Sequence, residues 1–232
     1  SGPRSRWRRS NVAVAYEADG DNQIFALSSM TISVVTTAAD YLAVKTAMTD
    51  STLSVSTVTH NLDTVSFVNA TESASPDIRI ELWERVAPDL GTLDVVITYS
   101  GSAVAVGGAV GFTGVHQTTP SADFTAATGA SGTNPSVTVP NVTADDYVLD
   151  CVQADNATTT LTVGANQTQL WNRDPFKPCA GSVQDGADGG AMTWTIGTGA
   201  WRMAGVRIVA AAAGAATWGP LMALKNNRLV AA

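Results

Sequence analysis

The chain has 232 residues, of which 14% are charged and 45% are hydrophobic, and its formal net charge at pH 7 is −7. An acidic chain offers little of the positive surface that binds phosphates, so we do not expect nucleic acid to be its main ligand. The abundance of Val and Thr favours strands over helices, and the length suffices for one large β-sandwich or two small domains.

The chain starts with a basic arm, residues 1–10. Without the arginines of this arm, the rest of the chain carries 9 basic and 20 acidic residues. The arm also contains Trp7. No apolar stretch follows it, so we expect no export signal and synthesis in the cytoplasm. The arginines are Arg4, Arg6, Arg8 and Arg9.

Short runs of alternating apolar and polar residues follow, which is the pattern of strands. The predicted strands are residues 11–16, 30–35, 41–48, 53–58, 65–68, 78–86, 93–99, 104–112, 136–139, 147–154, 161–163, 168–172, 192–196 and 201–209. Turn-forming residues separate them, among them 19–22 and 100–102. Residues 118–135, rich in Thr, Ser, Ala and Gly, are predicted to be a long loop.

These elements predict an all-β fold, an antiparallel β-sandwich with either jelly-roll or immunoglobulin-like strand order. We expect one sandwich domain over residues 11–209, because neither half contains enough strands to enclose a core of its own. The basic arm precedes this domain, and an apolar tail, residues 210–232, follows it.

The tail contains an apolar cluster, residues 218–224, which Lys225 and Arg228 follow. The chain has no uncharged apolar stretch of about 18 residues, so no membrane-spanning helix is expected. Aromatic and arginine side chains are frequent anchors of protein interfaces. We therefore predict that the arm and the tail bind partner proteins. The predicted contact residues are Arg4, Arg6, Trp7, Arg8, Arg9, Trp218, Leu221, Met222 and Leu224.

The two cysteines, Cys151 and Cys179, form one disulfide or remain two buried thiols. The chain has no CxxC motif and no Cys/His cluster, so no structural zinc is expected. We expect no cofactor.

Candidate catalytic groups are few. His60 and His116 follow strands and are expected to be solvated turn residues. Glu81 and Glu84 flank Trp83 and resemble the paired carboxylates of glycosidases, but alternation along a strand places such residues in a core or at an edge. The acidic residues at 145, 146, 185 and 188 are expected to form turns rather than a calcium site. No catalytic motif is present, so we predict a protein that is not an enzyme.

Six tryptophans are the other notable feature. Trp83, Trp171, Trp194 and Trp201 lie in predicted strands and are expected in the core. The alternative is an exposed platform that stacks on sugar rings.

Several segments carry a resemblance to a known group of proteins. They are Ile-Glu-Leu-Trp at 80–83, Val-Val-Ile-Thr-Tyr-Ser-Gly at 95–101, Gly-Phe-Thr-Gly-Val-His-Gln-Thr-Thr-Pro at 111–120, Gln-Thr-Gln-Leu-Trp-Asn at 167–172 and Trp-Arg-Met-Ala-Gly-Val at 201–206. The chain resembles, over about residues 12–209, β-sandwich modules of bacterial surface proteins and bacteriophage structural proteins. The resemblance implies a fold and no catalytic residues.

We therefore expect a virion structural protein, either a capsid decoration protein or a head or tail fibre component. Its partners would be other copies of itself or other virion proteins such as a major capsid protein, and its location the virion. The alternative is a secreted carbohydrate-binding or adhesion module, which would be extracellular or at the cell surface and bind carbohydrate.

Overall fold

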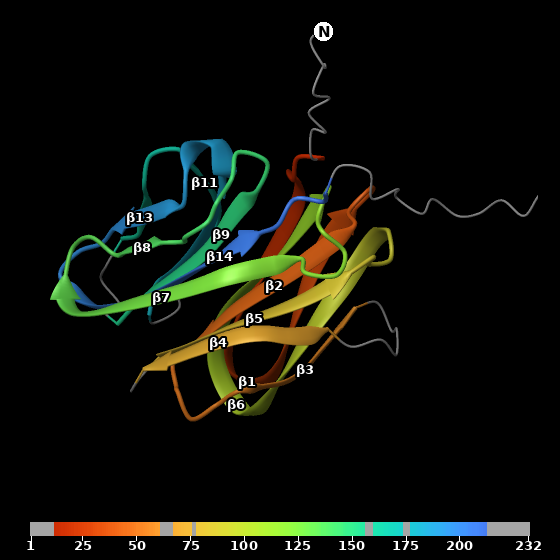
Figure 1. Cartoon of the computed structure of the whole chain (residues 1–232). Helices are drawn as coiled ribbons and strands as arrows, with labels where there is room; N and C mark the ends of the chain where they lie inside the picture. The colour runs from red at the N-terminus through yellow and green to blue at the C-terminus, as the bar shows by residue number, and fades with distance from the viewer. Residues whose placement is uncertain (1–11, 61–66, 76–77, 156–159, 174–176, 213–232) are drawn as a thin grey trace, which may run out of the picture.

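A computed structural model describes residues 12–60, 67–75, 78–155, 160–173 and 177–212 (Figure 1). These residues form strands and one 3-10 helix, which confirms the all-β prediction. The strands are β1 (Ala15–Thr36), β2 (Tyr41–Met48), β3 (Val55–His60), β4 (Val68–Ser75), β5 (Ile78–Val86), β6 (Gly91–Thr113), β7 (Ser121–Gly132), β8 (Ser136–Thr138), β9 (Tyr147–Ala154), β10 (Thr162–Val163), β11 (Gln167–Arg173), β12 (Cys179–Asp185), β13 (Ala191–Thr195) and β14 (Gly199–Ile208). The 3-10 helix η1 (Gly186–Asp188) follows β12.

Three antiparallel sheets are packed as sandwich-like layers (Figure 1). The first has the strand order β1-β6-β2-β5-β4, with β3 paired to β6 as its sixth strand. The second has the order β11-β12-β9-β14-β7, and the small third sheet has the order β10-β13-β8. The predicted antiparallel sandwich is thus confirmed, with three sheets among the described residues.

The long strands β1 and β6 bend the first sheet back on itself. The pairing of β1 with β6 shifts register on both sides of Leu27. A Cβ atom on Gly20 would lie only 2.0 Å from the carbonyl oxygen of Ser33, so the two halves of β1 lie against each other. The bend encloses a core that includes Met30, Ile32, Leu42, Val44, Val95 and Ile97.

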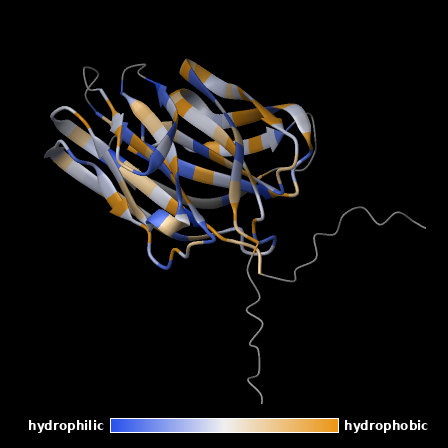
Figure 2. Ribbon diagram, turned by 90° about the horizontal axis from the view of Figure 1, so that it is seen from above, coloured by the Kyte–Doolittle hydropathy of each residue, from blue (hydrophilic) through white to orange (hydrophobic). Residues whose placement is uncertain are grey.

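β2 is buried on both faces. Tyr41 and Ala43 face the core shared with the second sheet, whereas Leu42 and Val44 face the core inside the bent first sheet. Because successive side chains of a strand point to opposite faces, a strand between two cores is apolar almost throughout. Figure 2 shows the apolar positions as bands along the strands.

The second sheet is also apolar on both faces. Leu149 and Val206 point into the core shared with the first sheet, and Val148 and Met203 pack with Trp194 of the third sheet. The core between the two large sheets draws on residues from both halves of the chain. β9 and β14 are therefore central strands between two cores.

Trp171 of β11 fills a narrow space between the two large sheets. A Cβ atom added to Gly108 of β6 would lie 2.4 Å from its ring, and one added to Gly181 of β12 would lie 2.0 Å from it. Glycine is needed at both positions because any side chain would overlap the indole. Trp171 is consequently buried, as predicted for a core residue.

Several predictions about the connecting segments are wrong. Residues 19–22, predicted as a turn, lie inside β1, and residues 100–102 lie inside β6. Residues 118–135, predicted as a loop, contain β7, and β12 and most of β4 were not predicted. Pairing with a neighbouring strand keeps these small and polar residues extended, so tertiary context overrides the local preference for turns.

Candidate functional site

The two ends of the described chain lie side by side. Val12 and Ala211 form an antiparallel bridge in which the Val12 amide donates to the Ala211 carbonyl oxygen over 3.3 Å. The Ala211 amide in turn donates to the Gly114 carbonyl oxygen over 2.8 Å, and Val115 forms a second bridge with Ala210. We call residues 12–14, 114–116, 145–146 and 209–211 the terminal junction.

A buried carboxylate, Asp146, holds the C-terminal side of this junction. One carboxylate oxygen accepts a hydrogen bond from the Ala210 amide at 2.9 Å, and the other accepts from the amide and the hydroxyl of Thr143, each at 2.9 Å. Arg207 lies 3.5 Å from the second oxygen. Asp146 therefore fixes where the chain leaves the second sheet.

Asp40 holds the neighbouring loop of the junction. Its carboxylate accepts hydrogen bonds from the amides of Gly114 at 2.8 Å and Val115 at 3.2 Å. Burial raises the pKa of Asp40, and the hydrogen bonds from these amides oppose that effect. Two carboxylates thus hold the segments on which both chain ends rest.

Charge is strongly divided between the ends and the body of the chain. Of the thirteen basic residues, six lie in residues 1–11 and 213–232, and these two segments contain no acidic residue. All 20 acidic residues lie in residues 12–212 with seven basic ones, a formal charge of −13. The two segments therefore carry a net positive charge, the body carries a net negative charge, and the segments adjoin the paired residues Val12 and Ala211.

The predicted contact residues belong to these segments and lie outside the described residues. They are Arg4, Arg6, Trp7, Arg8, Arg9, Trp218, Leu221, Met222 and Leu224. The terminal junction brings the attachment points of the two segments together, a relation that the sequence did not reveal.

Most cations of the body are paired internally. Arg79 lies 2.7 Å from Glu81, Arg207 lies 3.0 Å from Asp123, and Arg85 lies 3.5 Å from Asp89. Two further ion pairs join Arg173 with Asp21 and Lys177 with Asp155. Five of the seven basic residues between 12 and 212 thus form ion pairs within the described body, where acidic residues remain in excess.

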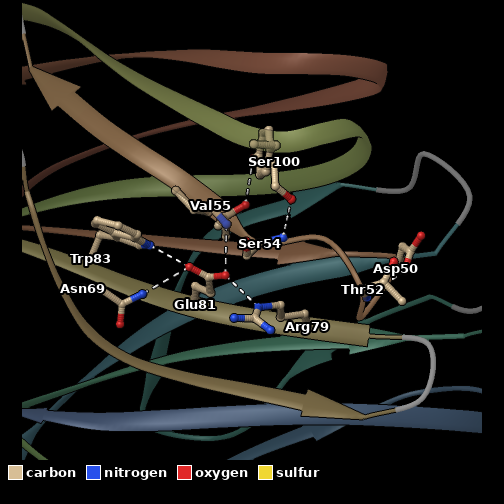
Figure 3. A network of polar contacts seen from close by, with 11 residues as sticks. Asp50, Thr52, Ser54, Val55, Asn69, Arg79, Glu81, Trp83 and Ser100 are labelled. Carbon is tan, nitrogen blue, oxygen red and sulfur yellow. Dashed lines mark hydrogen bonds and ion pairs between the residues drawn. The ribbon is translucent and has the colours of Figure 1, made fainter.

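Glu81 is the centre of a closed polar network (Figure 3). Its carboxylate accepts hydrogen bonds from the Val55 amide at 3.0 Å, the Asn69 side chain at 3.2 Å, Arg79 at 2.7 Å and the Trp83 indole at 2.9 Å. A carboxylate with four donors and 1% exposure ties β3, β4 and β5 together and has no open side for a substrate.

Glu84 lies on the other face of β5. It accepts hydrogen bonds from the hydroxyls of Tyr41 at 2.9 Å and Ser121 at 2.6 Å. Paired-carboxylate hydrolysis requires two carboxylates that face one site. The two glutamates lie on opposite faces of β5 and do not have this arrangement.

The two histidines are far from a catalytic arrangement. His60 is fully buried and packs edge-on against Phe67, with ring centroids 6.2 Å apart, so the prediction of a solvated residue is wrong there. The Nδ1 atom of His116 accepts a hydrogen bond from the Thr119 amide at 3.1 Å, which places this side chain in a turn.

The tryptophans in the strands do not form an exposed platform. Trp171 and Trp194 are buried, as predicted, and Trp83 and Trp201 are half-buried. The carbohydrate-binding alternative predicts an exposed aromatic face, and these four side chains do not provide one.

Lys45 and Asp150 are buried charges that the sequence analysis missed. The Lys45 ammonium donates to the carbonyl oxygens of Leu149 at 2.9 Å and Ala204 at 3.0 Å, and burial lowers its pKa to about 8. Burial raises the pKa of Asp150 to about 6. The signal for Lys45 was its place as a single charge inside the apolar run 41–48.

Cys151 and Cys179 are brought together in the core. Their sulfur atoms lie 3.7 Å apart, both residues are buried, and both are free thiols. The disulfide considered from the sequence is therefore not formed in this structure. The thiol of Cys151, and then burial, raise the pKa of Cys179 well above its usual value.

The described residues include no helix long and apolar enough to cross a membrane. They also include no group of three or more His, Cys, Asp or Glu side chains placed to hold a metal ion. No protein-family model, no curated protein and no solved structure matches the chain. The resemblance to surface and phage modules therefore remains a prediction.

Proposed function

We propose that this protein is a non-enzymatic structural component of a virus particle, which binds its neighbours through residues 1–11 and 213–232. The observation that carries the proposal is the terminal junction, where Val12 and Ala211 pair. Two segments that leave the body at one point can engage the same partner surface, which links their binding and raises the overall affinity.

The division of charge indicates the kind of partner. A body with a formal charge of −13 repels a second body, whereas terminal segments with six basic and no acidic residues attract it. The partner is therefore an acidic protein surface, either another copy of this chain or another protein of the particle. The apolar residues Trp218, Leu221, Met222 and Leu224 add burial to this attraction.

The resemblance of residues 12–209 to phage structural modules supports a virion as the setting. A capsid decoration protein or a fibre component needs a stable body and specific attachment. The closed network at Glu81 and the internally paired cations suit a rigid body of that kind.

Sedimentation velocity and native mass spectrometry of the full chain test the proposal. One variant replaces Arg4, Arg6, Arg8 and Arg9 with serine, and a second replaces Trp218, Leu221, Met222 and Leu224 with serine. We expect the full chain to form assemblies. The first variant should fail to assemble at low salt, where charge pairing contributes. The second should fail to assemble at low and high salt, because salt screens charge pairing but not apolar contacts.

The matched control is Arg85→Ser combined with Arg173→Ser, which removes positive charge from the body and leaves the terminal segments intact. Its assembly should equal that of the unchanged chain. Equal assembly of all four proteins, or their equal behaviour as monomers, would overturn the proposal. Glycan binding by a monomer would then favour the adhesion alternative.

A further inference from the structure

We propose that Cys179 and Gln153 form an internal thioester, a covalent cross-link between β12 and β9. The two residues are direct partners across these antiparallel strands, and both are fully buried. This inference is independent of the assembly role, because it concerns the core and not the terminal segments.

The backbone places the two side chains as close as a sheet allows. The neighbouring pair, Ala154 and Pro178, is joined by a hydrogen bond from the Ala154 amide to the Pro178 carbonyl oxygen at 2.9 Å. Hydrogen-bonded and non-hydrogen-bonded pairs alternate along an antiparallel ladder, so Cys179 and Gln153 form a non-hydrogen-bonded pair. In such pairs the Cα atoms are about 4.5 Å apart and the side chains approach most closely.

Within the described part of the chain, the side-chain amide of Gln153 makes no hydrogen bond that would account for its burial in the core. Both its oxygen and its nitrogen are buried without a hydrogen-bond partner. An unsatisfied buried amide is costly, and native structures rarely keep one. Loss of the nitrogen as ammonia would remove the two unmet N–H donors and leave a single carbonyl oxygen.

The reaction balances without an oxidant. The Cys179 sulfur attacks the side-chain carbonyl carbon of Gln153, a C–S bond forms, the C–N bond breaks, and the thiol proton leaves with the nitrogen as ammonia. Arg202 is the Cα partner of Gln153 on its other side, in β14. A guanidinium at that position suits the stabilisation of negative charge on the carbonyl oxygen during attack.

Cys151 is the competing partner of Cys179, since the sulfurs are 3.7 Å apart. Cys151 lies diagonally across the ladder, however, because Cys179 pairs with Gln153. Diagonal neighbours have Cα atoms about 7–8 Å apart, beyond the range of about 4.4–6.8 Å usual for disulfides. The direct pair with Gln153 needs no such backbone shift.

A thioester acylates primary amines, so small amines are the class of ligand that this site would take. In the folded chain the bond is buried and protected. We expect methylamine to attach to Gln153 once the chain is unfolded, with release of the Cys179 thiol.

Intact mass spectrometry of the full chain under denaturing conditions tests the inference. We expect a mass lower than that of the sequence by one ammonia, unchanged by a phosphine reductant, and methylamine incorporated at Gln153. Cys151→Ser should keep this loss, and Cys179→Ser should abolish it. A mass equal to that of the sequence, or a loss of two hydrogens that the reductant reverses, would overturn the inference.

Discussion

Lys45 and Asp150 lie on opposite faces of β9. Lys45 reaches from β2 across the core between the large sheets and donates to the carbonyl oxygen of Leu149, the residue before Asp150. The Asp150 carboxylate points to the other core, where the Trp194 indole donates to it at 2.7 Å and the Ser182 amide at 2.7 Å. Two opposite charges are thus buried on either side of one central strand.

Asp150 should make stability depend on pH in the mildly acidic range. Its pKa is raised from 3.8 to about 6 in the fold, so the folded state binds the proton more tightly than the unfolded state. Its contribution to stability is complete below about pH 4 and is lost as the pH rises through about 6.

The measurement is urea unfolding of the unchanged chain and of Asp150→Asn at pH 4 and pH 7. Relative to the variant, the unchanged chain should be more stable at pH 4 than at pH 7, by up to about 3 kcal/mol. If the stability difference between the unchanged chain and the variant is the same at pH 4 and pH 7, Asp150 has the same pKa in the folded and unfolded states.

Lys45 should make stability rise with pH in the alkaline range, which is the opposite of the effect of Asp150. Burial lowers its pKa from 10.5 to about 8, so the unfolded state binds the proton more tightly. The contribution to stability is present above about pH 10.5 and is lost as the pH falls through about 8. Lys45→Met should remove this rise while keeping a side chain of similar length. If the variant gains as much stability between pH 8 and pH 10 as the unchanged chain, the rise has another source.

The strands predicted best from the sequence have at least one face of bulky apolar residues. Residues 41–48, 78–86 and 147–154 were predicted with the same bounds as β2, β5 and β9. β2 and β9 have apolar side chains facing both cores, as a strand between two cores requires. β5 instead alternates, with Ile78, Ile80 and Leu82 in the core and mostly charged residues between them. The buried apolar residues that stabilise the fold are therefore also the residues by which its strands are recognised in the sequence.

The strands that were missed lack this signal for physical reasons. β12 reads Cys-Ala-Gly-Ser-Val-Gln-Asp and has small residues where the Trp171 ring rests on Gly181. Tight packing thus removed the apolar alternation by which strands are recognised. The terminal junction was not predictable either, since it depends on pairing between Val12 and Ala211, which are far apart in the chain.

The Trp171 site should tolerate no added methyl group. A Cβ atom at position 181 would overlap the indole ring at 2.0 Å, so Gly181→Ala forces a shift in the core. We expect a loss of about 1–3 kcal/mol in the free energy of unfolding.

Gly132→Ala is the matched control for this change. Its Cβ atom would approach nothing closer than 3.5 Å, so its unfolding midpoint in urea should stay near that of the unchanged chain. Combining Gly181→Ala with Trp171→Leu should recover part of the loss, because the smaller side chain leaves room for the methyl group. Equal stability of Gly181→Ala and Gly132→Ala would show that the ring is not confined between the sheets.

Asp146→Asn should loosen the C-terminal side of the terminal junction. The asparagine side chain has one oxygen, so it cannot accept from both the Ala210 amide and the Thr143 groups as the carboxylate does, and it loses the attraction of Arg207. Hydrogen exchange measured residue by residue should show faster exchange of the Ala210 and Ala211 amides, with the central strand β9 unchanged. The control is Asp94→Asn, at an exposed position of β6 that should leave both amides protected. If Asp146→Asn also leaves them protected, the backbone pairing of Val12 with Ala211 and of Val115 with Ala210 is sufficient to hold both chain ends in place.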